Sequence, residues 1–435
     1  MLKNKYKLTL SITSLLCLFP LFLWLISNDI TTKFGDFKSI MTSLGQITAL
    51  AGMVMFSISF IQSTRLKILD RYFQGLNILY RDHNRLGQIA FILLLAHPLF
   101  LLPKYTGGDL NEAAKFFLPI HGLAENSGII GLVLMIILIV MTLYLRPKYH
   151  IWKWTHKFFG LAFIFGFIHL WNTHSDTSRY LPLRIYMITI STLGLIAFIY
   201  KSILGKYLIK KSHYTISEIN KLNESTTEIV MLPETENEKL NFQAGQFIFI
   251  SFNNEESHPF TISSAPADRE LKIIIKKLGD YTLGVNNLTP GMKCEVEGAF
   301  GAFTFLNAEN KNQIWIAGGI GITPFLSLTK ALPINEGYNV DLIYCVSNRI
   351  EAVKIEEFNT FAEKHINQNG SLKINVFETR TMGRLSVEAI EKICGSIINK
   401  DIFICAPVPM IQSLKIQLKE KNIPNKLIHS EEFGF

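Results

Sequence analysis

The sequence predicts a six-helix transmembrane bundle, followed by an antiparallel β-barrel and then by an α/β domain with a parallel sheet. Hydrophobic residues make up 49% of the 435-residue chain, which is too apolar for a single soluble domain. The long apolar runs end near residue 204, and beyond it polar and apolar residues alternate at ordinary soluble density. We therefore expect three domains, over residues 1–204, 212–305 and 306–435, with a lysine-rich boundary at Lys201–Lys211.

Six segments of the first domain are long enough to cross a hydrocarbon core of about 30 Å, which takes about 20 helical residues. They are residues 8–27, 41–62, 83–102, 126–145, 153–172 and 182–204. The first is interpreted as a retained span, because its apolar run is long for a signal peptide and lacks a cleavage motif. Basic residues gather at the N-terminus, after the even-numbered spans and after the last one. This pattern predicts a multi-pass plasma-membrane protein with both termini in the cytoplasm.

The net charge of +8 does not indicate a nucleic-acid partner, because many basic residues flank spans and no RNA- or DNA-binding motif is present. The five cysteines are scattered without a CxxC pair, so the sequence supports neither a zinc site nor an iron–sulfur cluster nor a disulfide framework. We therefore expect membrane lipid, and no nucleic acid, as a partner.

The second half of the chain changes character twice. From about residue 212, short β-rich runs such as residues 228–232 and 246–252 are broken by Gly, Pro and Asn, which is typical of a β-barrel. After Gly301, strands alternate with helical stretches, which predicts a parallel α/β domain.

Four histidines lie in two predicted spans at matched spacing: His83 and His97 in the third, His156 and His169 in the fifth. Ionisable side chains inside membrane spans are costly and rarely lack a partner or a task. At about 1.5 Å per residue, the two pairs rise about 21 and 20 Å, so His83 matches His156 in depth and His97 matches His169. Neutral imidazoles at each level can bind an iron porphyrin from both sides, which predicts two b-type haems.

The rotation of the fifth span is less regular than its rise. At about 100° per residue, fourteen residues return to within about 40° of one face, whereas thirteen miss it by about 140°. The fifth helix therefore needs a tightened stretch or a differently rotated haem. His174 lies on the face of His156 but about 27 Å along the axis, beyond the span, so His169 is preferred. The alternative is that the four are structural histidines bonded to backbone carbonyls or to each other.

Three strings in the second half carry further chemistry. The first, His258–Pro266 (HPFTISSAP), follows a strand, and its hydroxyls and cation at a barrel edge can bind an isoalloxazine and its diphosphate. In the second, Lys276–Thr282, Gly279 lets the backbone approach a phosphate and Thr282 would begin a helix whose N-terminal amides attract anions. The candidate FAD-binding residues are His258, Pro259, Phe260, Thr261, Ser263, Ser264, Lys276, Gly279 and Thr282.

The third string, Ile314–Phe325 (IWIAGGIGITPF), is a strand that runs into Gly318, Gly319 and Gly321 and then into a helix. A glycine-rich turn in this setting binds a dinucleotide pyrophosphate. The next strand ends at Ser347 and Arg349, where a ribose 2′-phosphate could be bound. The sequence therefore favours NADPH over NADH as the cofactor. The alternative is that Arg349 is a surface residue that contacts only solvent.

HPFTISSAP, GDYT, GGIGITP, FICAP and the C-terminal EEFGF, after six spans with the paired histidines, closely resemble the NADPH oxidase/ferric reductase superfamily from about residue 41 onward. The resemblance implies a di-haem membrane domain joined to a ferredoxin–NADP reductase-like module. His83 with His156 would bind the inner haem, and His97 with His169 the outer one. The nucleotide-binding residues would be Gly318, Gly319, Gly321, Thr323, Pro324, Ser347 and Arg349. Cys405 would lie beside the nicotinamide and Phe435 would cover the flavin, so that Cys405, Thr323 and Phe435 are expected at the site of hydride transfer.

The chain departs from the family pattern in two places that bear on function. Ala406 stands where the family's CGP motif has glycine, and residues 41–62 carry Gln46 but no basic residue, whereas eukaryotic oxidases have an arginine there. The expected function is electron transfer from cytoplasmic NAD(P)H through FAD and two haems to an external acceptor. The expected acceptor is dioxygen, which would be reduced to superoxide. Alternatives are a ferric or cupric chelate reductase, a haem-binding membrane sensor without turnover, and a flavoprotein tethered by a haemless membrane domain.

Overall fold

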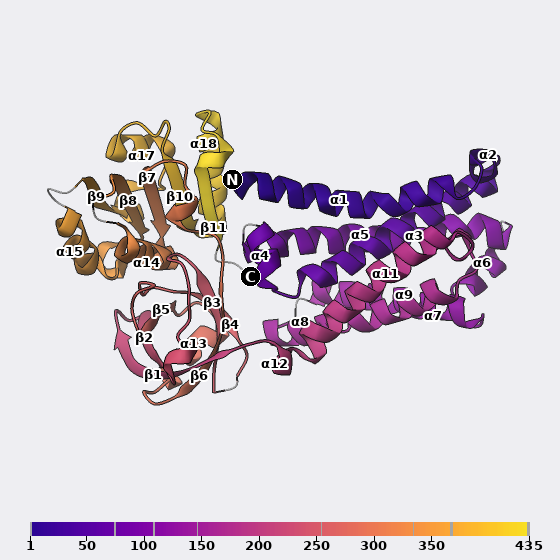
Figure 1. Ribbon diagram of the computed structural model, residues 1–435, viewed down its shortest axis with the longest axis horizontal. Helices are drawn as coiled ribbons and strands as arrows, with labels where there is room; N and C mark the ends of the chain where they lie inside the picture. The colour runs from indigo at the N-terminus through magenta and orange to yellow at the C-terminus, as the bar shows by residue number, and fades with distance from the viewer. Residues whose placement is uncertain are drawn as a thin grey trace. The chain divides into compact units, whose positions relative to one another are not determined.

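The computed structural model describes residues 2–73, 75–107, 109–145, 147–253, 255–333, 335–365 and 369–432. The chain divides into two compact units, Lys3–Ile209 and a second that begins at Lys210. The first unit consists of helices, and the second contains two β-sheets with their connecting helices (Figure 1).

Among the described residues, five helices are long and apolar enough to cross a membrane. They are α1 (Leu2–Ile26), α3 (Phe37–Gln62), α5 (Leu76–Thr106), α7 (Leu123–Val140), which a π-helical turn prolongs over Met141–Leu145, and α11 (Leu181–Phe198), prolonged likewise over Ile199–Ile203. The predicted span 153–172 is instead divided between α8 (Tyr149–His156) and α9 (Phe159–Asn172), neither of which has the length of a span by itself. The remaining helices are α2 (Ile30–Phe34), α4 (Lys67–Phe73), α6 (Leu110–Phe116), α10 (Asp176–Arg179) and α12 (Gly205–Leu208).

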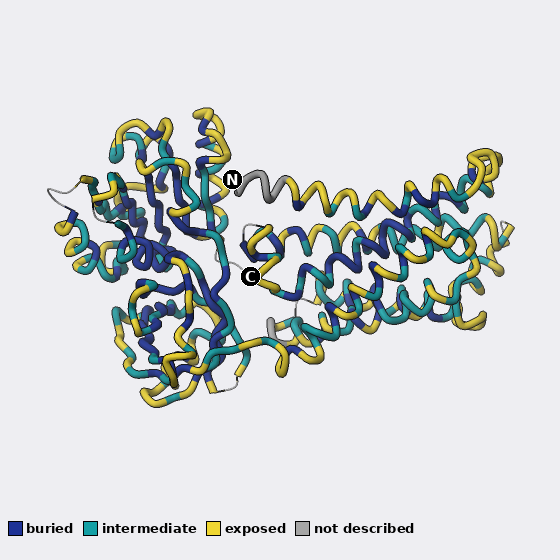
Figure 2. Tube along the Cα trace, in the orientation of Figure 1, coloured by how far each residue is buried: buried dark blue, intermediate teal, exposed yellow. Residues whose placement is uncertain are grey.

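The helical unit has an apolar exterior, as expected of helices that face lipid. In α7 the exposed face carries Ile130, Val133, Ile137 and Val140, at helical spacing, while the opposite face is buried (Figure 2). A helix that is apolar on its exposed face as well is typical of a membrane span.

Small residues let α3 and α5 approach closely. A Cβ atom added to Gly45 or Gly52 of α3 would lie 2.8 Å from the side chain of Leu101 or Leu94 of α5. Glycine at such crossings is the usual means of close packing between membrane helices, where apolar burial supplies no driving force.

The first part of the second unit is an antiparallel sheet in the order β4-β3-β6-β1-β2-β5. A bridge between Ile262, just after β4, and Ile273 of β5 nearly closes it into a barrel. Alternate residues such as Ile216, Ile248 and Ile250 fill its core. Its strands are β1 (Ser212–Lys221), β2 (Thr226–Pro233), β3 (Phe247–Phe252), β4 (His258–Thr261), β5 (Leu271–Lys276) and β6 (Lys293–Phe300).

The second part is a parallel sheet in the order β11-β10-β7-β8-β9, with helices in its connections. The strands are β7 (Asn312–Gly318), β8 (Tyr338–Val346), β9 (Gly370–Glu378), β10 (Asp401–Ala406) and β11 (Ile428–Glu432), and the main helices α14 (Thr323–Ala331), α15 (Ile355–His365), α17 (Val387–Cys394) and α18 (Val408–Glu420). Successive strands run from β7 through β8 to β9 in one direction, and β10 returns to the other side of β7. The sheet therefore has a topological switch point between β7 and β10.

The barrel and the parallel sheet share one continuous core. Ala244 and Ile274 of the barrel region belong to the same buried cluster as Trp315, Phe325 and other residues of the α/β part. This shared core explains why the two parts form a single compact unit.

Candidate functional site

The helical unit brings the four span histidines together in two facing pairs. The ring centroids of His83 and His156 lie 6.3 Å apart, and those of His97 and His169 lie 6.2 Å apart. The members of each pair come from α5 on one side and from α8 or α9 on the other. The pairing by depth that the spacing predicts is thus the pairing that the structure shows.

The break between α8 and α9 solves the rotation problem of the thirteen-residue spacing. Around it the backbone bonds are of the tightened i→i−3 kind: Lys157 to Trp154, Phe158 to Thr155, Gly160 to Lys157 and Leu161 to Phe158. Only Lys157 and Phe158 lie between the end of α8 and the start of α9, so His156 and His169 belong to separate helical segments whose relative rotation the tightened bonds change. The tightened stretch therefore turns His156 and His169 toward the same neighbouring helix.

Three of the four imidazoles have their tautomer fixed by a neighbouring helix. The Nδ1 atoms of His83 and His97 lie 2.8 Å from the carbonyl oxygens of Ser59 and Gly45 in α3, and that of His169 lies 2.8 Å from the carbonyl of Ala124. A carbonyl only accepts, so each Nδ1 carries the proton and each Nε2 keeps its lone pair.

His156 differs from the other three. Its Nδ1 is buried and has no hydrogen-bond partner among the described residues, and its ring packs on Trp152 and Phe159 at centroid distances of 5.0 and 5.1 Å.

This donor set fits a bis-imidazole metal centre at each level. Two imidazoles bound to one metal through bonds of about 2 Å each have ring centres roughly 6 Å apart, the separation found in both pairs. Metal-binding histidines almost always donate their other ring N–H to an acceptor such as a carbonyl, as three of these do. Three of the histidines thus make the carbonyl bonds that a purely structural role would require. Within the described part of the chain, however, none of the four Nε2 atoms has a hydrogen bond, so all four remain available to a metal.

The first motif of the second unit forms an edge of the barrel. Residues His258–Thr261 make β4, the terminal strand, paired antiparallel with β3. The His258 ring stacks on Tyr281 at a centroid distance of 3.6 Å, and Phe260 lies 6.5 Å from the same ring. Tyr281, the tyrosine of GDYT, was not singled out from the sequence, although it belongs to a quoted motif.

Hydroxyl groups accumulate unpaired at this edge. The oxygens of Thr261, Ser263 and Tyr281 are buried and have no hydrogen-bond partner among the described residues. Burial, aided by the charges of Glu255 and Glu256, raises the pKa of Tyr281, so its hydroxyl remains a proton donor at neutral pH. Buried unsatisfied hydroxyls are costly, and a ligand with acceptor oxygens and ring nitrogens would satisfy them.

The second motif forms a tight turn that is closed by its own threonine. The expectation that Thr282 begins a helix is wrong, because α13 (Asp280–Leu283) begins two residues earlier. The Thr282 hydroxyl instead accepts from the backbone N–H groups of Leu278, at 2.8 Å, and Gly279, at 3.0 Å. Space remains open beside Gly279, and the Lys276 ammonium lies 3.3 Å from the Glu351 carboxylate.

The glycine-rich turn lies at the switch point of the parallel sheet. Gly318 ends β7, Gly319 follows with a φ of +55°, and α14 begins at Thr323. A Cβ on Gly321 would lie 2.0 Å from the carbonyl oxygen of Cys405, and one on Gly318 would lie 2.8 Å from the Ala406 Cβ. The turn must therefore be glycine in order to pass the end of β10, and dinucleotides bind at this position in open α/β sheets.

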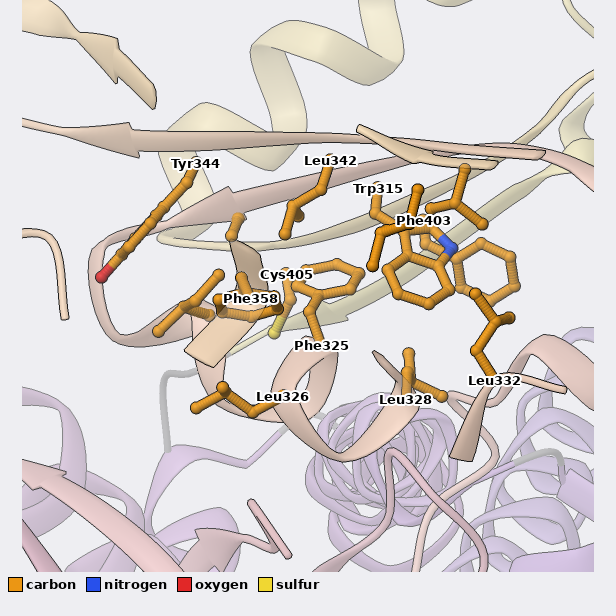
Figure 3. Close-up of a cluster of buried hydrophobic side chains, with 14 of the residues drawn as sticks. Trp315, Phe325, Leu326, Leu328, Leu332, Leu342, Tyr344, Phe358, Phe403 and Cys405 are labelled. Carbon is orange, nitrogen blue, oxygen red and sulfur yellow. The ribbon is translucent and has the colours of Figure 1, made fainter. Parts of the chain in front are cut away.

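The remaining predicted nucleotide residues surround the turn unevenly. Thr323 donates its hydroxyl to the Ile320 carbonyl, and Pro324 occupies the first turn of α14, where its missing N–H is harmless. Cys405 is fully buried, with its sulfur among Phe325, Leu326 and Phe358 (Figure 3), and burial followed by the charge of Glu431 raises the pKa of its thiol. Its place beside a nicotinamide stays a prediction, as does the role of Phe435, which lies outside the described residues.

Ser347 and Arg349 follow the end of β8, beside the end of β9. Arg349 is exposed, and its backbone N–H donates to the Glu378 carboxylate at 3.2 Å, while the Ser347 carbonyl accepts from the N–H of Arg380. The Arg349 side chain is thus accessible to a ligand, with an acidic neighbour that sequence inspection did not identify.

Comparisons with known proteins agree with this domain order. The model of the family "Ferric reductase like transmembrane component" matches residues 48–167, that of "FAD-binding domain" matches 213–319, and that of "Oxidoreductase NAD-binding domain" matches 315–415. The glycine betaine monooxygenase reductase subunit of Pseudomonas aeruginosa is 25% identical over 44% of this chain and 56% of its own length. Ferric reduction oxidase 7 of Arabidopsis thaliana is 24% identical over 73% of this chain and 44% of its own length.

The chain spans about half the length of these curated relatives. Among solved structures, the cytochrome b5 reductase domain of Ulva prolifera nitrate reductase aligns with a TM-score of 0.46 and 18% identity, over 51% of this chain and 97% of that one. With a ferric reductase-like transmembrane component followed by FAD- and NAD-binding domains, the chain belongs to the NADPH oxidase/ferric reductase superfamily.

Proposed function

We propose that this chain is a transmembrane oxidoreductase that moves electrons from cytoplasmic NAD(P)H through FAD and two b-type haems to a small acceptor on the outer face of the plasma membrane. The observation that carries the proposal is the presence of two imidazole pairs, 6.3 and 6.2 Å between ring centroids, in the same chain as a dinucleotide switch point. A sensor without turnover needs neither a second imidazole pair nor a second cofactor site.

The residues that would hold each group follow from the geometry. His83 with His156, and His97 with His169, would bind the two haem irons through Nε2. The edge formed by residues 258–264 and the turn at Gly279 would bind FAD, and the turn at 318–324 with Ser347 and Arg349 would bind the nucleotide, preferably NADPH. When bound, these groups supply hydride acceptance from the nucleotide and one-electron transfer across the membrane.

The protein's own contribution is to orient the histidine side chains and to shape the turn that would bind the nucleotide. The carbonyls of Ser59, Gly45 and Ala124 hold three imidazoles in the tautomer that presents Nε2 to a metal. Glycine at positions 318 and 321 lets the nucleotide turn pass the end of β10, and the first turn of α14 presents backbone N–H groups there.

His97 and His169 would both hold the metal of the outer site, so the external acceptor is proposed to receive electrons without binding that metal. A ferric chelate is favoured by the family of the membrane domain and by the named relative. Gln46, in the span where eukaryotic oxidases carry an arginine, accepts a hydrogen bond from the Trp24 indole at 2.7 Å and is itself uncharged. Dioxygen is the second candidate.

The decisive experiment is a reduced-minus-oxidised difference spectrum of the purified full chain in detergent. Anaerobic NADPH is expected to produce flavin bleaching and a b-type haem band, with dithionite as the control for total haem. Absence of a b-type band with dithionite would refute the haem assignment, and a band with dithionite alone would favour the sensor. Superoxide and ferrous-chelate assays in liposomes would then distinguish the two acceptors.

A further inference from the structure

One short helix connects the two cofactor motifs of the second unit. Helix α14 begins at Thr323, directly after the glycine-rich turn, and runs to Ala331. From its polar face, Ser327 donates its hydroxyl to the Ser264 carbonyl at 2.6 Å, and Lys330 donates its ammonium to the Ser263 carbonyl at 3.1 Å. Residues three apart share a helix face, so these two side chains hold two adjacent carbonyls of the HPFTISSAP segment.

The contact is buried and paired throughout. Ser327 and Ser264 are fully buried, and the Lys330 side chain is only 11% exposed. The ammonium of Lys330 also lies 2.8 Å from Glu357 of α15. A buried cation is tolerated only when its charge and its hydrogen bonds are satisfied, and here a carboxylate and a carbonyl do so.

The pairing continues back into the barrel. Glu357 lies 3.5 Å from Lys354, which in turn lies 2.9 Å from Glu228 of β2, a carboxylate that is 5% exposed. Burial by itself would raise the pKa of Glu357, but the ammonium groups of Lys330 and Lys354 outweigh it and hold that pKa below its ordinary value. Charges therefore alternate from α14 across α15 to the barrel, and each charge has an opposite neighbour.

We propose that Ser327 and Lys330 are positioning residues for hydride transfer, which act by fixing the flavin-binding segment relative to the nucleotide turn. The proposal rests on the proposed function. Hydride transfer breaks a C–H bond of the nicotinamide and forms a bond to the flavin, so the nucleotide is oxidised and the flavin is reduced. Its rate falls steeply with misplacement, because a displacement of 1 Å can cost about 100-fold. A helix that starts at one binding motif and is bonded to the other controls this distance.

The test compares Lys330→Met with Lys400→Met in the full-length holoprotein. Lys400 is a matched control, because its ammonium also binds one carboxylate, Asp341 at 3.3 Å, and one carbonyl, Cys394 at 2.9 Å, but within the α/β part alone. Anaerobic stopped-flow measures flavin reduction at saturating NADPH together with the nucleotide dissociation constant. For Lys330→Met we expect the limiting rate to fall between about 10- and 100-fold, with little change in the dissociation constant. For Lys400→Met both quantities should stay at wild-type values, and Lys330→Arg should restore most of the rate.

A second readout is independent of turnover. Hydrogen exchange without nucleotide should show faster exchange at the amides of Ser263 and Ala265 in Lys330→Met than in Lys400→Met. Ser327→Ala, which removes a smaller contact, keeps the test informative if Lys330→Met does not fold, and its limiting rate should fall in the same direction.

The outcomes are distinguishable from those of the proposed function. If wild-type protein does not reduce its flavin with NAD(P)H, the proposed function fails. If wild type does so, but folded Lys330→Met and Ser327→Ala keep its limiting rate and its exchange pattern, the positioning role is refuted. A lowered melting temperature with an unchanged limiting rate would likewise assign the contact a purely structural role.

Discussion

Replacing Gly321 by alanine tests whether the glycine-rich turn must pass directly over the end of β10. An added Cβ would lie 2.0 Å from the carbonyl oxygen of Cys405 and 2.7 Å from its carbonyl carbon. Cβ contacts under 3.0 Å essentially never occur, so the turn or the strand must move by at least about 1 Å. Both contacts are with the backbone at the carboxyl end of β10, an interior strand of the parallel sheet, and no side-chain rotation relieves them.

Overpacking of this kind costs about 1–3 kcal/mol. In a unit of 150–250 residues, that cost lowers the melting temperature by about 2–12 °C. Thermal release of flavin fluorescence from the full chain measures the shift, and titration with NADPH should show a weakened affinity because the turn has moved. The control is Gly284→Ala, at a φ of −68° with open space around the Cβ, which should be neutral or slightly stabilising. Wild-type melting temperature and NADPH affinity in Gly321→Ala would refute the close approach.

Three further predictions concern the other parts of the molecule. His83→Leu should abolish one b-type haem and electron transfer beyond the flavin, while flavin reduction by NAD(P)H persists; two haems per chain in this variant would contradict the ligand assignment. Arg349→Ala should raise the KM for NADPH well above that for NADH, since a charge-assisted hydrogen bond to phosphate is worth about 1.5–3 kcal/mol, and equal effects on both cofactors would show that Arg349 does not bind the 2′-phosphate. Glu357→Gln should destabilise the protein at pH 7, because it removes the ion pairs that lower the pKa of Glu357. These ion pairs stabilise the fold fully at pH values above 4.5, the ordinary pKa of a glutamate, and the stabilisation is lost as the pH falls through the lower pKa of the folded state. The difference in melting temperature between the variant and wild type should therefore shrink below pH 4.5, and a constant difference would exclude the ion pairs as its cause.

Much of the architecture follows from local features of the sequence. The length of the apolar runs, the short β-rich runs and the alternation of strands with helical stretches are all local features. They predicted the helical unit, the barrel and the parallel sheet that the structure contains. The depth of the histidines was predictable for the same reason, because the helical rise depends on residue number alone. The number of continuous spans was not predictable in this way, because the fifth span is broken at residues 157–158.

The orientation of the site residues depends on contacts between segments far apart in the chain, and the sequence did not determine it. The sequence left open whether the fifth helix is tightened or the haem rotated, and the i→i−3 bonds near Lys157 settle the helix geometry. The carbonyls that fix the imidazole tautomers belong to other helices, and the bonds of Ser327 and Lys330 to residues 263 and 264 link segments more than sixty residues apart. The sequence alone thus determined which residue types stand at which depth and in which motif. Only the tertiary structure decided which atoms they meet, because a hydrogen bond between distant segments requires both to be folded and packed first.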